Sequence, residues 1–318
     1  MTLLPPNTPP APLEPLREAT LTPDAERRGW IALLPPRLRD YALLARMDRP
    51  IGSWLLFWPC AWSVALAGTL PGDWRLVLWL GLGSIAMRAA GCVYNDIVDR
   101  DLDRKVARTR VRPVAAGRVS VRAAAIWMAL LCLIGLVVLL QLNRLAQGVA
   151  LGSLALVAAY PFMKRITWWP QAWLGLVFTW GALVGWPAAL GSFGWPAVAL
   201  YAAAFWWTMG YDTVYALQDI EDDVVAGVKS SARRLGTHAR GGIALFYLLT
   251  ILFMALALWL RRPDPLALLA LIPAALHFCW QAATLDPADD ANALRRFRSN
   301  RFAGLLLFLA TWVVGSAG

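Results

Sequence analysis

The chain has 318 residues, of which 59% are hydrophobic and 16% charged, with a net charge of +10 and a mean hydropathy of +0.53. Soluble globular domains contain fewer apolar and more charged residues, so these values exclude that class. We therefore expect an all-α integral membrane protein, in which each spanning helix needs about 20 mostly apolar residues.

The first 40 residues differ from the rest of the chain. They hold nine of its 21 prolines and no sustained apolar period, which is typical of disordered segments. They also lack a basic start followed by an apolar stretch, so we expect no secretory signal. The sequence predicts a Pro-rich, disordered cytoplasmic tail at 1–40 and a membrane-embedded domain at 41–318.

Nine apolar segments follow the tail, and the turns between them leave no room for a separate soluble domain. We assign each segment to a helix that crosses the apolar core of a bilayer, which is about 30 Å thick. The segments lie at 51–69, 75–95, 123–141, 145–163, 170–190, 196–217, 242–260, 264–284 and 302–317. The prediction is a bundle of nine transmembrane helices.

Basic residues are divided unevenly between the two sets of loops. If the N-terminus is cytoplasmic, the loops on that side hold 18 lysines and arginines and the opposite loops hold four. The positive-inside rule then assigns the richer side to the cytoplasm. These cytoplasmic loops are 100–122, 164–169, 224–241 and 285–301. Topology and attraction to anionic lipid account for the net charge, so we expect no nucleic-acid partner.

Acidic residues gather in two short windows, each at the cytoplasmic end of a predicted helix. Four of the 20 acids lie in NDIVDRDLD, residues 95–103, and five lie in DTVYALQDIEDD, residues 212–223. A charge at the centre of a bilayer costs about 2.5–3.5 kcal/mol on the insertion scale, so acids in or beside a membrane helix indicate function by default. The alternative is a solvated helix end.

The spacing of these acids favours a cation site. Asp96, Asp99 and Asp103 recur at i, i+3 and i+7, and Asp219 and Asp223 at i and i+4, so each set lies on one helix face. Like charges on one face repel, and oxygen ligands without nearby Cys or His favour a hard ion, Mg²⁺ first. Since the ends of the first set are about 10 Å apart along a helix, either two ions bind or another anion helps one ion.

Basic residues, among them Arg112 and Lys229, are interleaved with the acids. Acids alone would suit a cation channel, whereas acids, Mg²⁺ and basic groups together suit a phosphate or diphosphate. Basic loops are also expected from topology alone. The two windows end the second and sixth helices, so two four-helix pseudo-repeats plus one helix would bring both windows to the same membrane face.

At this point the motifs resemble a known family. NDIVDRDLD resembles the NDxxDxxxD motif, and DIEDD the DxxxD motif, of the UbiA-type intramembrane aromatic prenyltransferases. The stretches RMDRPIGSWLLFWPCAW, MRAAGCVYND, YPFMKRIT and YDTVYALQDIEDDVVAGVKSSA resemble the branch that prenylates 4-hydroxybenzoate in ubiquinone biosynthesis. The resemblance extends from about Arg46 to the C-terminus and leaves out the Pro-rich tail.

The resemblance implies a helix bundle around a central cavity, in which Mg²⁺ holds a polyprenyl diphosphate. The implied metal ligands are Asp96, Asp99, Asp103, Asp219 and Asp223, and the implied catalytic set is Asp99, Asp103, Asp219, Asp223 and Arg165. The expected substrate-binding residues are Asn95, Arg46, Arg112, Lys164, Lys229, Tyr160 and Asp212. Asp101 and Glu221 depart from some relatives, but they point off the ligand face.

The implied reaction is prenyl transfer to the carbon ortho to the hydroxyl of 4-hydroxybenzoate. Mg²⁺ and basic side chains neutralise the departing diphosphate, and aromatic rings stabilise the allylic cation in a water-free pocket. Expected partners are the two substrates and membrane lipid, with no obligate protein partner evident. The implied location is a bacterial inner membrane, or the mitochondrial inner membrane in a eukaryote.

Other functions remain open at this stage. Within the family, homogentisate, naphthoate or haem could replace 4-hydroxybenzoate as the acceptor. A divalent-cation transporter would need a polar path across the whole membrane, yet the outer halves of the predicted helices are nearly free of charge. A phospholipid-head-group transferase shares the metal and diphosphate logic but would carry a different acidic motif, with small residues between the acids.

Overall fold

The computed structural model describes residues 30–106, 109–220, 224, 227 and 229–317. For Ala32 and Lys164 it describes the backbone alone. Within this part of the chain the regular elements are all helices, which confirms the predicted all-α class. In chain order they are η2 (Trp30–Leu33), α1 (Pro36–Leu44), α2 (Ile51–Ala67), α3 (Trp74–Val98), α4 (Arg100–Asp103), α5 (Val121–Leu140), α6 (Arg144–Ile166), α7 (Pro170–Phe178), α8 (Gly181–Leu190), α9 (Trp195–Ala216), η3 (Leu217–Asp219), α11 (Ser231–Leu235), η4 (Gly236–His238), α12 (Ala239–Arg261), η5 (Pro265–Leu271), α13 (Ile272–Thr284) and α14 (Asp290–Ser316).

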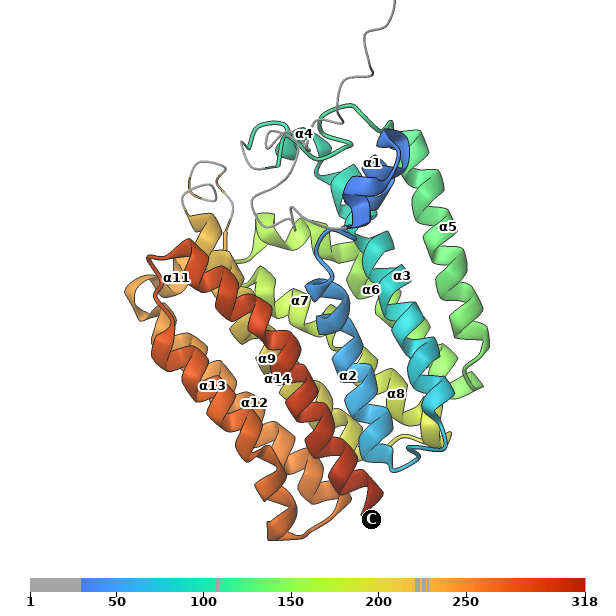
Figure 1. The fold of residues 1–318 in the computed structure, drawn as a ribbon, viewed down its shortest axis with the longest axis vertical. Helices are drawn as coiled ribbons and strands as arrows, with labels where there is room; N and C mark the ends of the chain where they lie inside the picture. Colours follow the sequence, from blue (N-terminus) through green and yellow to red (C-terminus); the bar gives the residue numbers. More distant parts are fainter. Residues whose placement is uncertain (1–29, 107–108, 221–223, 225–226, 228, 318) are drawn as a thin grey trace, which may run out of the picture.

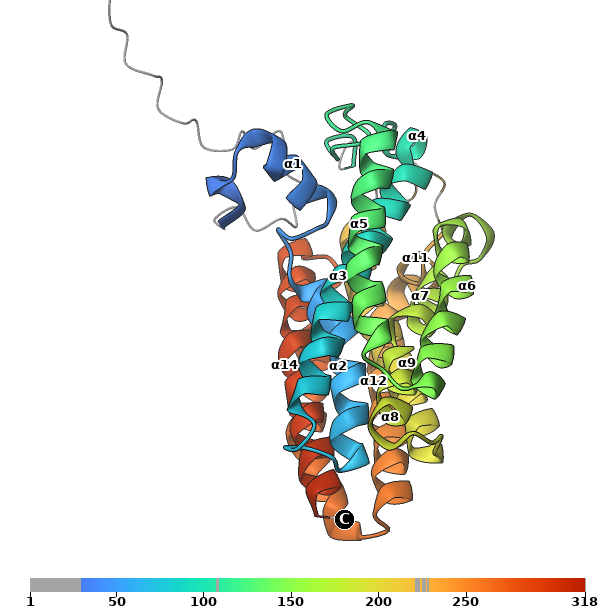
Figure 2. The ribbon, with the colours of Figure 1, turned by 90° about the vertical axis from the view of Figure 1, so that its right-hand side faces the viewer.

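The long helices lie side by side in an elongated bundle (Figures 1 and 2). Helices α1 and α4 lie at one end of the bundle, and the C-terminus lies at the other. Its main core forms where α2, α9, α12 and α14 meet. There the fully buried rings of Trp62 and Trp207 are 4.9 Å apart, and Trp62 Nε1 donates to the carbonyl of Gly304 at 2.8 Å. This core includes α9, whose C-terminal end leads into the second acidic window.

Six helical segments of the described chain are long and apolar enough to cross a membrane. They are Trp74–Val98, Val121–Leu140, Arg144–Met163, Pro170–Leu190, Ser231–Arg261 and Pro265–Thr284. A shorter apolar helix covers Ile51–Ala67. Many large apolar side chains on these helices are exposed, Leu78, Ile126 and Leu252 among them, as expected where lipid covers the surface. The chain is thus a multi-pass membrane protein, and nine crossings stay a prediction.

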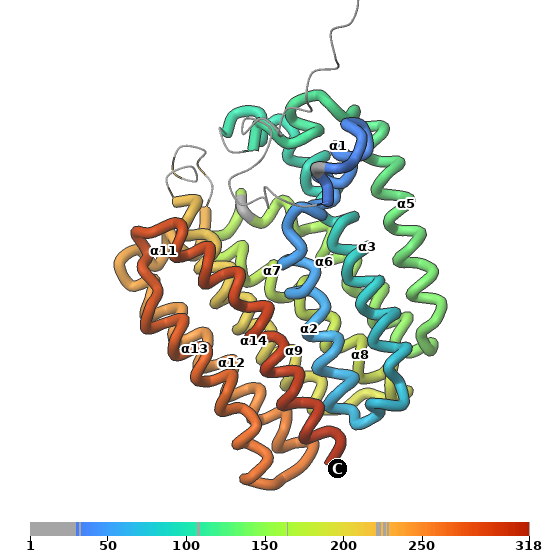
Figure 3. The backbone as a smooth tube through the Cα atoms, in the orientation of Figure 1, coloured from blue at the N-terminus to red at the C-terminus, as the bar shows by residue number. Residues whose placement is uncertain are grey.

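Two predicted segments differ in the structure. The segment 170–190 is two helices, α7 and α8, because the chain turns at Thr179, whose hydroxyl donates to the carbonyl of Gly175 at 2.6 Å and competes with the helical pattern. The last helix, α14, begins at Asp290 instead of 302. Figure 3 shows it as one long helix that ends at the C-terminus. Its first turns are charged, so an apolar window could not reveal them, and Asp289 caps it by accepting from the Asn292 N–H.

Helix α1 runs across residue 40, where the sequence placed the boundary between the tail and the membrane-embedded domain. Asp40 of α1 forms an ion pair with Arg118 at 2.8 Å, and Tyr41 packs edge-on against Trp127 of α5. These contacts pack α1 against the loop that precedes α5 and against α5 itself. Residues 1–29, where a disordered tail was predicted, lie outside the described residues.

Candidate active site

The first acidic window lies where α3 passes into α4. Asp99 separates the two helices, but its N–H donates to the Asn95 carbonyl and the Asp103 N–H donates to the Asp99 carbonyl, both at 2.8 Å, so the helical path continues. Asp96, Asp99 and Asp103 are 1%, 0% and 4% exposed, whereas the Asp101 side chain is 72% exposed. The three aspartates share one buried face, as their spacing predicts, and Asp101 points away.

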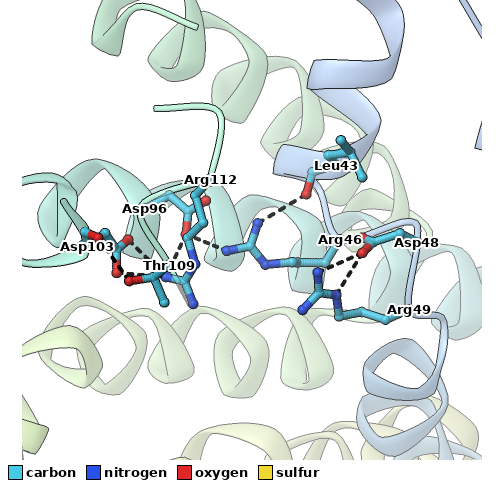
Figure 4. A network of polar contacts seen from close by, with 8 residues as sticks. All are labelled: Leu43, Arg46, Asp48, Arg49, Asp96, Asp103, Thr109 and Arg112. Atoms are coloured by element: carbon cyan, nitrogen blue, oxygen red, sulfur yellow. Dashed lines mark hydrogen bonds and ion pairs between the residues drawn. The ribbon is translucent and has the colours of Figure 1, made fainter. Parts of the chain in front are cut away.

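Arginines from separate parts of the chain pair with two of these aspartates (Figure 4). Arg46 Nη2 lies 2.6 Å from Asp96 Oδ1. Arg112 Nη1 lies 3.2 Å from the same oxygen and 2.9 Å from Asp103 Oδ2. Repulsion between the acids is therefore already relieved by guanidinium groups, and one nitrogen reaches both Asp96 and Asp103. The carboxylates of Asp96 and Asp103 are therefore closer together than the rise of the helix between the two residues suggests.

The backbone of Arg46 has an unusual conformation. Its φ of 56° makes it the one non-glycine residue of the described chain with a positive φ, between α1 and α2. Its Nη1 donates to the Leu43 carbonyl at 3.1 Å, and Arg88 of α3 donates to the Arg46 carbonyl at 2.8 Å. A left-handed backbone at an arginine is sparsely populated, so these contacts hold Arg46 in the orientation that reaches Asp96.

Residues beyond the predicted set also belong to this network. The Asp48 side chain is 2% exposed and accepts from Arg49 at 2.7 Å, and the Thr109 hydroxyl donates to the Asp103 carbonyl at 3.1 Å (Figure 4). Sequence reasoning singled out none of these three, and it also missed Arg88. Arg88 could have been found, because a lone charge inside a predicted membrane helix is a functional signal.

The third aspartate pairs with a different helix. Arg165, at the C-terminal end of α6, lies 3.0 Å from Asp99 Oδ1. Lys229 donates to the Ile166 carbonyl at 3.2 Å, and its ammonium lies 5.9 Å from the centre of the Trp168 ring. These contacts bring the segment after α9 to the end of α6, so Arg165 and Lys229 lie at the same end of the bundle as the first window.

The second window is described in part. Asp219 ends η3, directly after α9, and it interacts electrostatically with the half-buried Asp212. The Tyr160 side chain of α6 interacts electrostatically with both Asp212 and Asp99. Asp212 of α9 and Asp99, which follows α3, therefore both act on Tyr160 of α6. Asp223 and the side chain of Lys164 lie outside the described residues, and Asn95 is partly buried next to Asp96 in the last turns of α3.

The donor atoms of the first window suit a hard cation. Among the described residues, no three acidic, His or Cys side chains form a metal-binding group, and arginine nitrogens lie between the carboxylates. Asp96 Oδ2 is nevertheless buried without a hydrogen-bond partner, and buried unpaired oxygens are uncommon. Burial raises the pKa of Asp103 above its ordinary value, although Arg112 opposes the shift. Oxygen donors of this kind are those that Mg²⁺ prefers, so the residues fit such an ion.

Buried carboxylates beside arginines suit a negatively charged group bound together with a divalent cation, because guanidinium groups bind phosphate oxygens in pairs. Fold and site together define a helical membrane protein with a polar site at one end of its bundle. The chain belongs to the UbiA prenyltransferase family, whose model matches residues 56–312.

Two curated relatives are similar over most of the chain. The mitochondrial 4-hydroxybenzoate polyprenyltransferase of Arabidopsis thaliana is 44% identical over 286 residues, which cover 88% of this chain and 70% of the relative. The protein of the same name from Caenorhabditis elegans is 42% identical over 282 residues, which cover 87% of this chain and 79% of the relative.

Solved structures share the fold. A UbiA homolog from Aeropyrum pernix K1 has a TM-score of 0.68 at 24% identity and covers 82% of this chain and 97% of its own. A UbiA homolog from Archaeoglobus fulgidus bound to GPP and Mg²⁺ has a TM-score of 0.64 at 19% identity and covers 87% of this chain and 99% of its own. At these identities the likeness supports the fold alone.

Proposed function

We propose that the chain transfers a polyprenyl group from polyprenyl diphosphate to 4-hydroxybenzoate, a step of ubiquinone biosynthesis. The observation that carries this proposal is the buried cluster of three aspartates with three arginines at one end of the bundle. These residues are Asp96, Asp99, Asp103, Arg46, Arg112 and Arg165. The identity of 42–44% with relatives of that name supports the choice of acceptor.

The proposed metal is Mg²⁺, held by Asp96, Asp99 and Asp103 on one side and by Asp219 and Asp223 on the other. When bound, the ion neutralises charge that develops on the leaving diphosphate. Asn95 and Asp212, beside the two sets of ligands, are proposed to bind substrate.

The basic residues are proposed to bind the diphosphate directly. Arg46, Arg112, Lys164 and Lys229 supply donors that stabilise its growing charge without acting as proton donors. The allylic C–O bond breaks and its electron pair leaves with the diphosphate. The ring carbon ortho to the hydroxyl of 4-hydroxybenzoate then forms the new C–C bond and loses its proton. Tyr160, with Asp99 and Asp212 nearby, is proposed to line the reaction space and exclude water.

An acceptor screen tests this function. Membranes that contain the chain, a polyprenyl diphosphate and Mg²⁺ should prenylate 4-hydroxybenzoate in preference to homogentisate, a naphthoate or haem. Prenyl transfer to one of these other acceptors alone would assign the chain a different substrate. Uptake of divalent cations into vesicles without any prenyl transfer would favour a transporter instead.

The variant Arg165→Lys tests the substrate that this residue holds. A lysine cannot reproduce a planar, two-point contact with a carboxylate. If Arg165 holds the carboxylate of 4-hydroxybenzoate, the KM for the acceptor should rise and that for the donor should stay unchanged. A rise in the donor KM alone would place Arg165 on the diphosphate.

The remaining assignments concern the whole chain. We propose nine membrane crossings in two four-helix pseudo-repeats plus one helix, a central cavity, a cytoplasmic site, and a tail at 1–40 outside the prenyltransferase domain at 41–318. The membrane is proposed to be the bacterial inner membrane, or the mitochondrial inner membrane in a eukaryotic cell, as the names of the relatives favour. No nucleic acid and no obligate protein partner are part of the proposal.

A further inference from the structure

Arg112 lies at the position between two carboxylates that a shared cation would take. Its Nη1 is 3.2 Å from Asp96 Oδ1, and 3.1 and 2.9 Å from the two oxygens of Asp103. Magnesium binds oxygen at about 2.0–2.1 Å, so it would have to draw these oxygens closer than the guanidinium group allows. Arg112 and a metal ion therefore cannot share the position between Asp96 Oδ1 and Asp103.

The guanidinium group of Arg112 is incompletely satisfied where it lies. Its Nε is buried and has no hydrogen-bond partner in the described chain, which is unfavourable for a charged donor. Arg46, the other partner of Asp96, is held more firmly because its Nη1 also donates to the Leu43 carbonyl and Arg88 holds its backbone. In the described chain the side-chain hydrogen bonds of Arg112 go to carboxylates alone, whereas Arg46 is also anchored to a backbone carbonyl, so Arg112 is the freer of the two to leave.

We propose that Arg112 competes with the metal ion for the same site. Its guanidinium group holds Asp96 and Asp103 until a diphosphate draws that group away. This inference rests on the proposed function. A diphosphate offers several charged oxygens, to which a guanidinium group binds in pairs. Its arrival gives Arg112 a better partner and removes Arg112 from both carboxylates. Asp103 and the unpaired Oδ2 of Asp96 are then open to the cation, while Asp96 Oδ1 keeps its contact with Arg46. Metal and diphosphate then bind cooperatively, and neither is held tightly alone.

Linkage makes the cooperativity measurable from either side, since each ligand must raise the affinity for the other by the same factor. Coupling of this kind is typically about 5- to 150-fold. The test uses the full chain in lipid nanodiscs, with Mn²⁺ as the metal and geranyl thiodiphosphate as a donor that ionises poorly. Electron paramagnetic resonance counts free Mn²⁺, and nanodiscs without protein correct for chelation by the thiodiphosphate.

Three chains are compared. In the unsubstituted chain, thiodiphosphate should tighten Mn²⁺ binding within that range. In Arg112→Gln, Mn²⁺ should bind more tightly without thiodiphosphate, by about 5-fold or more, and the further gain on adding it should shrink. The control is Arg118→Gln, an arginine of the same loop whose partner is Asp40, and it should behave like the unsubstituted chain.

Two results would overturn the proposal. One is a Mn²⁺ affinity of Arg112→Gln that equals or falls below that of the unsubstituted chain. The other is an equal Mn²⁺ affinity of the unsubstituted chain with and without thiodiphosphate. This second result needs no variant, so it can be obtained even if Arg112→Gln does not fold. Prenyl transfer by that chain is scored separately. Prenyl transfer without coupling between metal and thiodiphosphate would reject the proposed competition by Arg112 and leave the proposed function standing. Coupling without transfer to any acceptor would reject the proposed function and leave the competition standing.

Discussion

Replacement of Asn300 by leucine should destabilise the protein by about 1–3 kcal/mol, because Asn300 joins four helices through buried polar contacts. Its Oδ1 accepts from Trp207 Nε1 at 2.8 Å, and its Nδ2 donates to Gln281 Oε1 at 3.1 Å. The Tyr247 hydroxyl donates to the same Gln281 oxygen at 3.0 Å. All four side chains are at most 2% exposed. They come from α9, α12, α13 and α14.

The magnitude follows from the groups left without partners. Leucine nearly conserves volume, so the cavity contribution is small, but Trp207 Nε1 and the Gln281 amide each lose a buried contact. A buried unsatisfied group costs about 1–3 kcal/mol in a soluble protein. Hydrogen bonds between membrane helices average about 0.6 kcal/mol with a maximum near 1.7 kcal/mol. Two such losses, on the membrane scale, give the expected range.

The assay is unfolding of the full chain in mixed detergent micelles, followed by circular dichroism as the denaturing detergent is increased. The control is Ser299→Ala on the same helix, whose hydroxyl donates only to the Arg296 carbonyl of that helix, and it should change stability by less than about 0.5 kcal/mol. In a double-mutant cycle, Gln281→Met combined with Asn300→Leu should cost less than the sum of the single changes. Full additivity, or unchanged stability of Asn300→Leu, would refute the reasoning.

Three further outcomes are expected. Gly315→Ala should destabilise the protein by about 1–3 kcal/mol, because its Cβ would overlap the Ala65 carbonyl. Gly148→Ala, in a helix with open space at that position, should be neutral or stabilising. Equal detergent-unfolding midpoints of the two variants would count against this packing. EDTA should abolish prenyl transfer and Mg²⁺ should restore it, while full activity in excess EDTA would exclude metal dependence. In a background without native cysteines, Ala116→Cys should react with an impermeant maleimide only from the cytoplasmic side and Gly72→Cys only from outside, and the reverse pattern would invert the topology.

The periodicity of the first window predicted its geometry well. The side chains at i, i+3 and i+7 of a helix share one face, and Asp96, Asp99 and Asp103 are buried together while Asp101 is exposed. That inference needed only local geometry, because the helical path continues through Asp99. Local rules of this kind can be read from a sequence without any knowledge of the surrounding fold.

The partners of those aspartates could not be predicted in the same way. Arg46 and Arg165 lie 50 and 66 residues from the acids they contact, so the pairing depends on how helices pack against one another. The resemblance marked both arginines as basic positions near substrate, but it did not assign them to particular carboxylates. The left-handed backbone of Arg46 is still harder to foresee, since no glycine or asparagine marks the turn.

The predicted helix boundaries were wrong where the apolar segment and the helix do not coincide. The first turns of α14 are rich in arginine, so an apolar window excludes them although they are helical. The break between α7 and α8 lies inside a continuous apolar run, where hydropathy has no contrast to detect. Both errors have one physical origin, because a hydropathy scale reports the preference for lipid and not the backbone conformation.

The balance of charge at the site explains how such acidic residues can be buried at a membrane edge. Removing one partner of a buried ion pair is commonly destabilising by about 3–5 kcal/mol, since it leaves an uncompensated charge. Three buried carboxylates without partners would therefore oppose folding, whereas Arg46, Arg112 and Arg165 compensate them without a ligand. The same arginines bind phosphate well, so a metal–diphosphate complex can replace arginine–aspartate pairs with arginine–phosphate and aspartate–metal contacts. The groups that compensate the buried carboxylates are thus the groups that the proposed reaction needs.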